Sequence, residues 1–462
     1  MNSEKSTPNR SPHVVIVGGG AAGMMAALSA AENGAAVTIL EQNEKLGKKL
    51  YITGKGRCNL TNEADPAGHL DNIVSNARFM FSAETLFDAK AVCALFNGLG
   101  TRLKVERGGR VFPESDHASD ITRALEYECR RLGVKISLDT KVAGLDTEEI
   151  TEAKSLSGND ALQSTDDTDG KRHKTGRKKK SGYSKKCVGV ILDDGTKISA
   201  DAVILATGGV SYPSTGADGS GLEMARRAGH KVTDLYPALV PLLTKEKWVA
   251  DLAGLTLKNI AITVKNGNKK VYEDFGELLF THTGVSGPVI LSASSHITGY
   301  LKEDRKKDDA GLLLCIDLKP ALDREKLDKR LIRDLEEAAA KQMKNILGQL
   351  MPKSMIPVVL DIAGIDEDKR ACDLTRAERV SLLDTLKCLP LTITGTFGFD
   401  AAVITRGGIS VKEIDPHTMG SKLIKNLYFA GECMDVDALT GGYNLQIAWS
   451  SGHAAGAGAA KA

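Results

Sequence analysis

A short β-branched run near the start of the chain leads directly into a glycine-rich turn. Residues 14–17, all Val or Ile, have the composition of a fully buried strand, and G-x-G-x-x-G follows at residues 18–23. An alanine-rich helical pattern then continues to about Asn33, and a second apolar run ends at Glu41, 18 residues after Gly23. In this strand–turn–helix–strand order, the glycine pattern indicates an α/β fold that binds a dinucleotide.

Each residue of this unit has an expected role. We expect Gly18, Gly20, Ala22 and Gly23 to form the turn, because glycines there let the backbone approach a pyrophosphate and the helix approach the strand. The helix N-terminus would offer unsatisfied N–H groups to the phosphates. Glu41, followed by Gln42, would accept hydrogen bonds from the adenosine ribose. A carboxylate there would repel a 2′-phosphate, which disfavours NADP and leaves FAD and NAD.

Composition narrows the class of protein. The length of 462 residues predicts roughly two to four domains. A net charge of +2 argues against a general nucleic-acid binder, for which a basic surface is expected. Eight cysteines without C-x-x-C spacing indicate neither a metal site nor a disulfide framework, and we expect reduced thiols. No leader-like apolar segment or membrane span is recognisable, so we expect a cytoplasmic enzyme.

The periodicity of apolar residues divides the remaining chain. A helix is expected over 115–132 with Ser115 or Asp116 as its N-cap, β-like alternation runs through 230–318, and a helix beginning at Thr375 carries a capping box. Glycine-rich strand-to-helix turns return near the C-terminus. We therefore expect an α/β, Rossmann-like domain built from both chain ends, with an antiparallel, barrel-like β domain and a small helical domain inserted. The expected segments are 1–210, 211–318, 319–394 and 395–462.

One segment departs from these patterns. Eight acids fall between 146 and 169, and nine Lys or Arg without an acid lie between 171 and 186. With so little apolar content, we expect 146–186 to be a disordered, solvated insertion. The alternative is a basic tether for nucleic acid, with strongly salt-dependent binding.

Several motifs taken together resemble one family. They are the N-terminal unit, Gly56-Arg57-Cys58-Asn59-Leu60-Thr61-Asn62, Ala206-Thr207-Gly208-Gly209, Thr405-Arg406-Gly407-Gly408, and the two segments Phe429-Ala430-Gly431-Glu432 and Gly441-Gly442-Tyr443-Asn444. This set is similar to that of the BaiN-like FAD-dependent oxidoreductase family, and the likeness spans the chain apart from 146–186.

The resemblance implies FAD as the cofactor and assigns further residues to it. The pyrophosphate would lie on residues 18–23 and the ribose on Glu41, and a helix opening at Asn444 would direct its N-terminus toward the flavin pyrimidine edge. Further contacts to FAD are implied for Lys49, Arg57, Asn59, Val142, Thr207, Gly208, Gly431, Glu432 and Leu445.

The resemblance also implies a reaction. Its most specific form is reduction of the conjugated C=C bonds of a 3-oxo-4,6-diene bile acid by hydride transfer from flavin N5, with a small, sterol-like substrate and no nucleic acid. Arg406 and His282 are candidate donors to the substrate. The alternatives are an FAD-dependent oxidase of a small amine such as aminoacetone, and a flavin-containing protein associated with nucleic acid. Without a second dinucleotide motif, any NAD(P)H donor would visit the flavin transiently.

Overall fold

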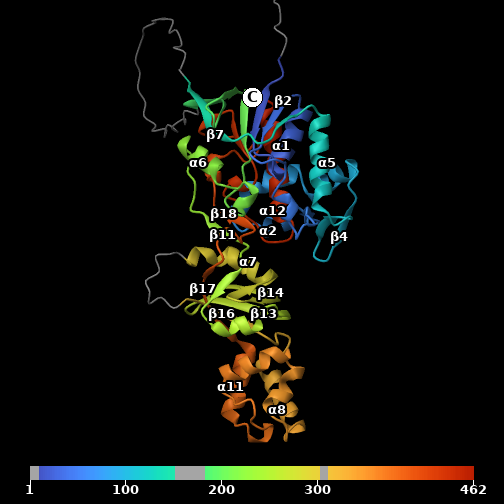
Figure 1. Cartoon of the computed structure of the whole chain (residues 1–462), viewed down its shortest axis with the longest axis vertical. Helices are drawn as coiled ribbons and strands as arrows, with labels where there is room; N and C mark the ends of the chain where they lie inside the picture. Colours follow the sequence, from blue (N-terminus) through green and yellow to red (C-terminus); the bar gives the residue numbers. More distant parts are fainter. Residues whose placement is uncertain (1–9, 151–182, 302–310) are drawn as a thin grey trace, which may run out of the picture.

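The computed structural model describes residues 10–150, 183–301 and 311–462. It is elongated, with an α/β domain at one end, a β-barrel in the middle and a group of helices at the other end (Figure 1). The barrel is joined to the α/β domain by two chain segments that pair as antiparallel strands, β11 (Tyr236–Ala238) and β18 (Ile404–Arg406). All that lies between these strands in sequence is inserted into the α/β domain.

The α/β domain is organised around one parallel sheet of five strands in the order β20-β10-β1-β2-β6. The C-terminal strand β20 pairs with β10, so both ends of the chain build this domain, as predicted. The bounds are β1 His13–Val17, β2 Ala36–Leu40, β6 Lys135–Ser137, β10 Ala202–Leu205 and β20 Leu427–Phe429.

Helices α1 (Ala21–Glu32) and α12 (Tyr443–Ala459) pack closely together beside this sheet. Two glycines permit the approach, because a Cβ at Gly452 would lie 2.5 Å from the Ala22 carbonyl oxygen and one at Gly456 would lie 2.3 Å from that of Ala26. The other helices are α2 Pro66–Asp71, α3 Ala77–Leu86, α4 Ala89–Gly98, α5 Ala118–Arg131 and α6 Ser220–Arg227.

Two small sheets complete the domain. One has the order β3-β5-β4, and in the other β8 pairs with β19, β7 and β9. Their bounds are β3 Thr61–Asn62, β4 Leu103–Glu106, β5 Arg110–Pro113, β7 Val142–Glu149, β8 Lys185–Leu192, β9 Lys197–Ser199 and β19 Ile424–Lys425.

The middle of the molecule is a closed barrel in the order β12-β15-β14-β13-β16-β17, which confirms the barrel-like antiparallel domain. Helix α7 (Pro288–Ile297) packs on β14 and lies on the side nearer the α/β domain (Figure 1). The strands are β12 Leu242–Thr244, β13 Thr256–Asn266, β14 Lys269–Thr281, β15 Gly284–Ser286, β16 Leu312–Asp317 and β17 Leu389–Thr396.

The helical segment lies between β16 and β17 in sequence, and its buried side chains form one apolar cluster with those of the barrel. The capping box at Thr375 is present at the start of α11. The segment boundary expected at 394/395 falls within β17. The helices are α8 Arg324–Glu337, α9 Met343–Ile346, α10 Ile356–Ala363 and α11 Arg376–Lys387.

Three expectations need correction. The N-cap of α5 is His117 rather than Ser115 or Asp116, because Asp116 has a positive φ of 58° and its carboxylate binds Arg57 and Lys104 instead. The margins of the charged segment are ordered, since residues 146–149 end β7 and 185–186 begin β8. Residues 151–182, for which disorder is also expected, lie outside the described residues.

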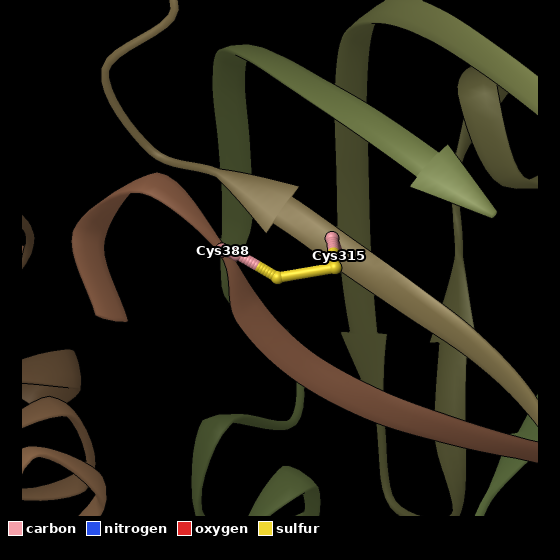
Figure 2. The surroundings of a disulfide bond; sticks show 2 residues. All are labelled: Cys315 and Cys388. Carbon is pink, nitrogen blue, oxygen red and sulfur yellow. A yellow bond between two sulfur atoms is a disulfide. The ribbon is translucent and has the colours of Figure 1, made fainter. Parts of the chain in front are cut away.

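The third correction concerns the thiols. Cys315 in β16 and Cys388, which ends α11, form a disulfide, so the expectation of reduced thiols throughout is wrong for this pair (Figure 2). Strands β16 and β17 are neighbours in the barrel, and this pairing places the Cα atoms 4.6 Å apart. The two cysteines are 73 residues apart, so no short spacing pattern in the sequence indicates that they pair.

Candidate cofactor and active site

A groove opens at the carboxyl ends of the parallel strands of the α/β domain. The residues that end or follow four neighbouring strands line it, namely Val17, Leu40, Ala206 and Ala430. The groove has a volume of about 200 Å³ and is partly open to solvent. In open α/β sheets this edge is where ligands bind.

The glycine turn has the form that the sequence predicts. Gly18 has a φ of +101°, and a Cβ at Gly23 would lie 1.9 Å from the Gly18 carbonyl oxygen, so both positions require glycine. Gly20 faces open space, since no atom of the described residues lies within 4 Å of the position its Cβ would take. Within the described part of the chain no side chain caps the N-terminus of α1, which leaves N–H groups for an anionic ligand. Gly18, Gly20 and Ala22 line the groove, whereas Gly23 lies behind it.

Glu41 lies at the end of β2 and is 7% exposed. Its Oε2 accepts the Gly19 N–H at 2.7 Å, and its Oε1 accepts the backbone and side-chain N–H groups of Asn43 at 2.9 and 2.7 Å. These bonds fix the carboxylate at the groove wall, where its remaining lone pairs can meet ribose hydroxyls. Gln42 also lines the groove and donates to the Gly216 carbonyl oxygen.

Lys49 and Glu432 meet across the groove. Lys49 Nζ lies 2.8 Å from Glu432 Oε2 and 2.7 Å from Ser211 Oγ. Glu432 also accepts the Thr405 N–H at 2.8 Å. This network joins the N-terminal and C-terminal parts of the domain beside Gly431, which likewise lines the groove.

Arg57 and Asn59, expected as cofactor donors, do not line the groove. The Arg57 guanidinium binds Glu106 and Asp116 and lies over the Phe112 ring, with its Cζ 4.2 Å from the ring centroid. Its carboxylate partners raise the pKa of Arg57. Asn59 Oδ1 is buried and has no hydrogen-bond partner among the described residues.

The other expected cofactor residues do line the groove: Val142, Thr207, Gly208, Asn444 and Leu445. Thr207 Oγ1 is buried without a partner in the described part of the chain, as expected of a group that a ligand satisfies. Asn444 has another role, because its Oδ1 accepts from Ala438 N and its Nδ2 donates to Ala438 O. This side chain braces the loop before α12.

The groove also contains residues that the sequence did not point to. Asn43 and Thr140 lie beside Glu41, and residues 215–217 face them from the segment before α6. Val403, Ile404 and Val436 line the groove toward the barrel. The glycines around 207–221 were the one sequence feature that could have indicated part of this set. The other positions are ordinary apolar or polar residues that belong to no motif.

The two candidate donors to the substrate lie in different places. Arg406 is in β18, on the same face as the groove-lining Ile404 two residues earlier, and its Nη1 donates to the Ser295 carbonyl oxygen at the end of α7. Burial raises the pKa of Asp435 and Asp437, and the positive charge of Arg406 opposes that shift. His282 is exposed in the turn between β14 and β15 and does not line the groove.

A Rossmann-like domain with an open groove at its glycine turn, an acidic side chain at the end of β2 and an inserted barrel define the class of FAD-dependent oxidoreductases. Within that class the chain belongs to the HI0933-like family. The family model described as "HI0933-like protein Rossmann domain" matches residues 12–168 and 159–458.

Two relatives cover nearly the whole chain. A 3-dehydro-bile acid delta(4,6)-reductase of Clostridium scindens is 34% identical over 96% of this chain and 98% of its own length. A ribosomal RNA dihydrouridine synthase of Haemophilus influenzae is 30% identical over 95% of this chain and 96% of its own.

Among solved structures, the 3-ketosteroid delta1-dehydrogenase of Sterolibacterium denitrificans in complex with 1,4-androstadiene-3,17-dione has a TM-score of 0.50. It is 14% identical, with 97% of this chain and 99% of that one covered, and supports the fold alone. No helix among the described residues is long and apolar enough to cross a membrane.

Proposed function

We propose that the protein is an FAD-dependent reductase that saturates a C=C bond conjugated to a carbonyl group. The observation that carries this proposal is that two relatives matching nearly end to end, one named for a bile acid and one for RNA, share this chemistry. A 4,6-diene beside a 3-oxo group and the 5,6 double bond of uracil are both conjugated to a carbonyl. The reaction common to the two relatives is therefore reduction of a C=C bond conjugated to a carbonyl group.

The proposed role of the chain is to hold the cofactor and to orient the substrate. The glycine turn and the N-terminus of α1 would hold the pyrophosphate, Glu41 the ribose, and Lys49 the phosphate or ribityl chain. When bound, FAD supplies hydride chemistry at N5. Arg406 would donate hydrogen bonds to the carbonyl oxygen as negative charge develops there.

For the substrate we propose a 3-oxo-4,6-diene bile acid first, since the relative with that activity is 34% identical. The second candidate is a uridine in ribosomal RNA, favoured by the relative at 30% and by the nine cations between 171 and 186, most of which lie outside the described residues. Oxidation of a small amine such as aminoacetone is the third alternative.

Anaerobic half-reactions test these alternatives. The holoenzyme is reduced with light or a nicotinamide, and a 3-oxo-4,6-diene steroid or a uridine-containing rRNA fragment is then added. We expect one of the two to reoxidise the flavin and lose its double bond. Flavin bleaching of the oxidised enzyme by aminoacetone, with no reaction of either acceptor, would contradict the proposal.

A further inference from the structure

The junction between the barrel and the α/β domain contains polar groups with unused hydrogen-bonding capacity. Arg406 reaches from β18 to the carboxyl end of α7, where its Nη1 donates to the Ser295 carbonyl oxygen. A guanidinium has five N–H donors. Among the described residues this is its one hydrogen bond, and it makes no ion pair there. Arg406 is therefore held by the barrel, with donors to spare.

His296, the next residue of α7, lies close enough to Arg406 for the guanidinium charge to affect it. Burial and, secondarily, the charge of Arg406 lower the pKa of His296, and Asp274 opposes the shift. Neither ring nitrogen has a hydrogen-bond partner in the described part of the chain. A neutral imidazole has one N–H donor and one acceptor, so this side chain can bind a polar ligand atom.

The barrel fixes the His296 ring in place. The Tyr272 ring stacks on it, with centroids 4.7 Å apart and planes 21° apart. The Tyr272 hydroxyl donates to Asp274 Oδ2 at 2.9 Å, and Asp274 Oδ1 accepts the Phe275 N–H. Asp274 thus anchors Tyr272, and Tyr272 orients His296.

The same junction adjoins the cofactor groove along β18 and the segment around Val436. Ile404 and Val436 line the groove, Arg406 follows Ile404 on the same face of β18, and Asp435 and Asp437 flank Val436. Both carboxyls interact electrostatically with Arg406. A ligand that extends from the groove toward the barrel would reach Arg406 first and His296 beyond it.

We propose that the carbonyl oxygen of an α,β-unsaturated carbonyl compound is bound at this junction between Arg406 and His296, with Tyr272 and Asp274 as positioning residues. This inference rests on the proposed function. It makes the substrate site bipartite, because neither the α/β domain nor the barrel contains it alone, and it places the barrel histidine of the site at position 296 rather than 282.

Binding to the oxidised holoenzyme tests the site without turnover, because no reductant is present. A 3-oxo-4,6-diene steroid and a uridine oligoribonucleotide are titrated separately, and the change in the flavin absorption spectrum gives the Kd. His296→Phe keeps an aromatic ring to stack on Tyr272 and removes both nitrogens, and His282→Phe is the matched control. We expect about tenfold weaker binding of whichever ligand binds in His296→Phe, about threefold in Tyr272→Phe, and less than twofold in His282→Phe.

Three further measurements separate a loss of binding from a loss of folding. FAD content and the melting temperature show whether each variant is folded. If His296→Phe is not folded, the histidine ring signals of the wild-type protein are followed by NMR. Ligand must then shift the His296 signal and leave the His282 signal unchanged. Wild-type affinity in His296→Phe, or an unmoved His296 signal under saturating ligand, would overturn the site. Failure of the wild type to bind either compound would instead contradict the proposed function.

Discussion

Lys49 and Glu432 lie 383 positions apart in the chain, yet Lys49 Nζ is 2.8 Å from Glu432 Oε2 at the groove. Lys49→Met would remove a cation from the expected phosphate path and leave the partly buried Glu432 carboxylate without its counter-ion. We expect FAD affinity to fall about tenfold or more, measured by equilibrium dialysis. Lys45→Met is the control, because Lys45 lies over the Tyr51 ring and does not line the groove. Equal affinities in the two variants would exclude the role given to Lys49.

The second and third glycines of the motif, Gly20 and Gly23, should have different effects on stability and on FAD binding. In Gly23→Ala the new methyl would meet the Gly18 carbonyl oxygen, so we expect a clearly destabilised protein that retains little FAD. In Gly20→Ala the methyl enters open space, so we expect an unchanged melting temperature without cofactor and much weaker FAD binding. Normal FAD content in purified Gly20→Ala would show that the pyrophosphate lies elsewhere.

Stability should depend on pH through Glu84 of α3, which is buried beside His69 of α2. Burial raises its pKa to about 8, so the folded state binds more protons than the unfolded state between about pH 4.5 and 8. The contribution of Glu84 to stability therefore declines as pH rises through this range, at most about 1.4 kcal/mol per pH unit. We expect the free energy of unfolding of Glu84→Gln to fall less steeply with pH than that of the wild type, as measured by urea unfolding at pH 5, 6, 7 and 8. The same dependence of unfolding free energy on pH in the two proteins would contradict this prediction.

The disulfide between Cys315 and Cys388 closes a loop that contains the helical segment. Loop-closure entropy assigns such a crosslink roughly 4 kcal/mol. We expect reductant to lower the melting temperature of the wild type and to leave that of Cys315→Ser unchanged. A labelling assay for free thiols gives the oxidation state directly. An equal effect of reductant on both proteins would show that the change does not come from this disulfide.

The parts of the fold that are local in sequence could be predicted, and the parts that depend on distant pairing could not. The turn at residues 18–23, the acidic residue ending β2 and the capping box at Thr375 each depend on a few neighbouring residues. Closure of the barrel depends on pairing between β12 and β17, about 150 residues apart, and no short pattern encodes it.

The roles of the site residues also depend on contacts between segments that are distant in the sequence. Arg57 looks like a cofactor donor in its motif, but its partners Glu106 and Asp116 come from β4 and from the segment before α5. The sequence pointed to His282 because of its Thr-His-Thr-Gly context, whereas His296 has an unremarkable helical context. Its proximity to Arg406 arises because α7 packs between the barrel and β11, the strand that pairs with β18.

A single-turnover titration under anaerobic conditions tests whether the reduced flavin saturates a C=C bond conjugated to a carbonyl group. The photoreduced holoenzyme is mixed with increasing 3-oxo-4,6-diene bile acid or uridine-containing rRNA, and flavin reoxidation and loss of the double bond are measured in the same samples. With one of these acceptors, we expect one C=C bond to be lost for each flavin reoxidised. Flavin that stays reduced with both acceptors, or is reoxidised without loss of a C=C bond, would contradict it.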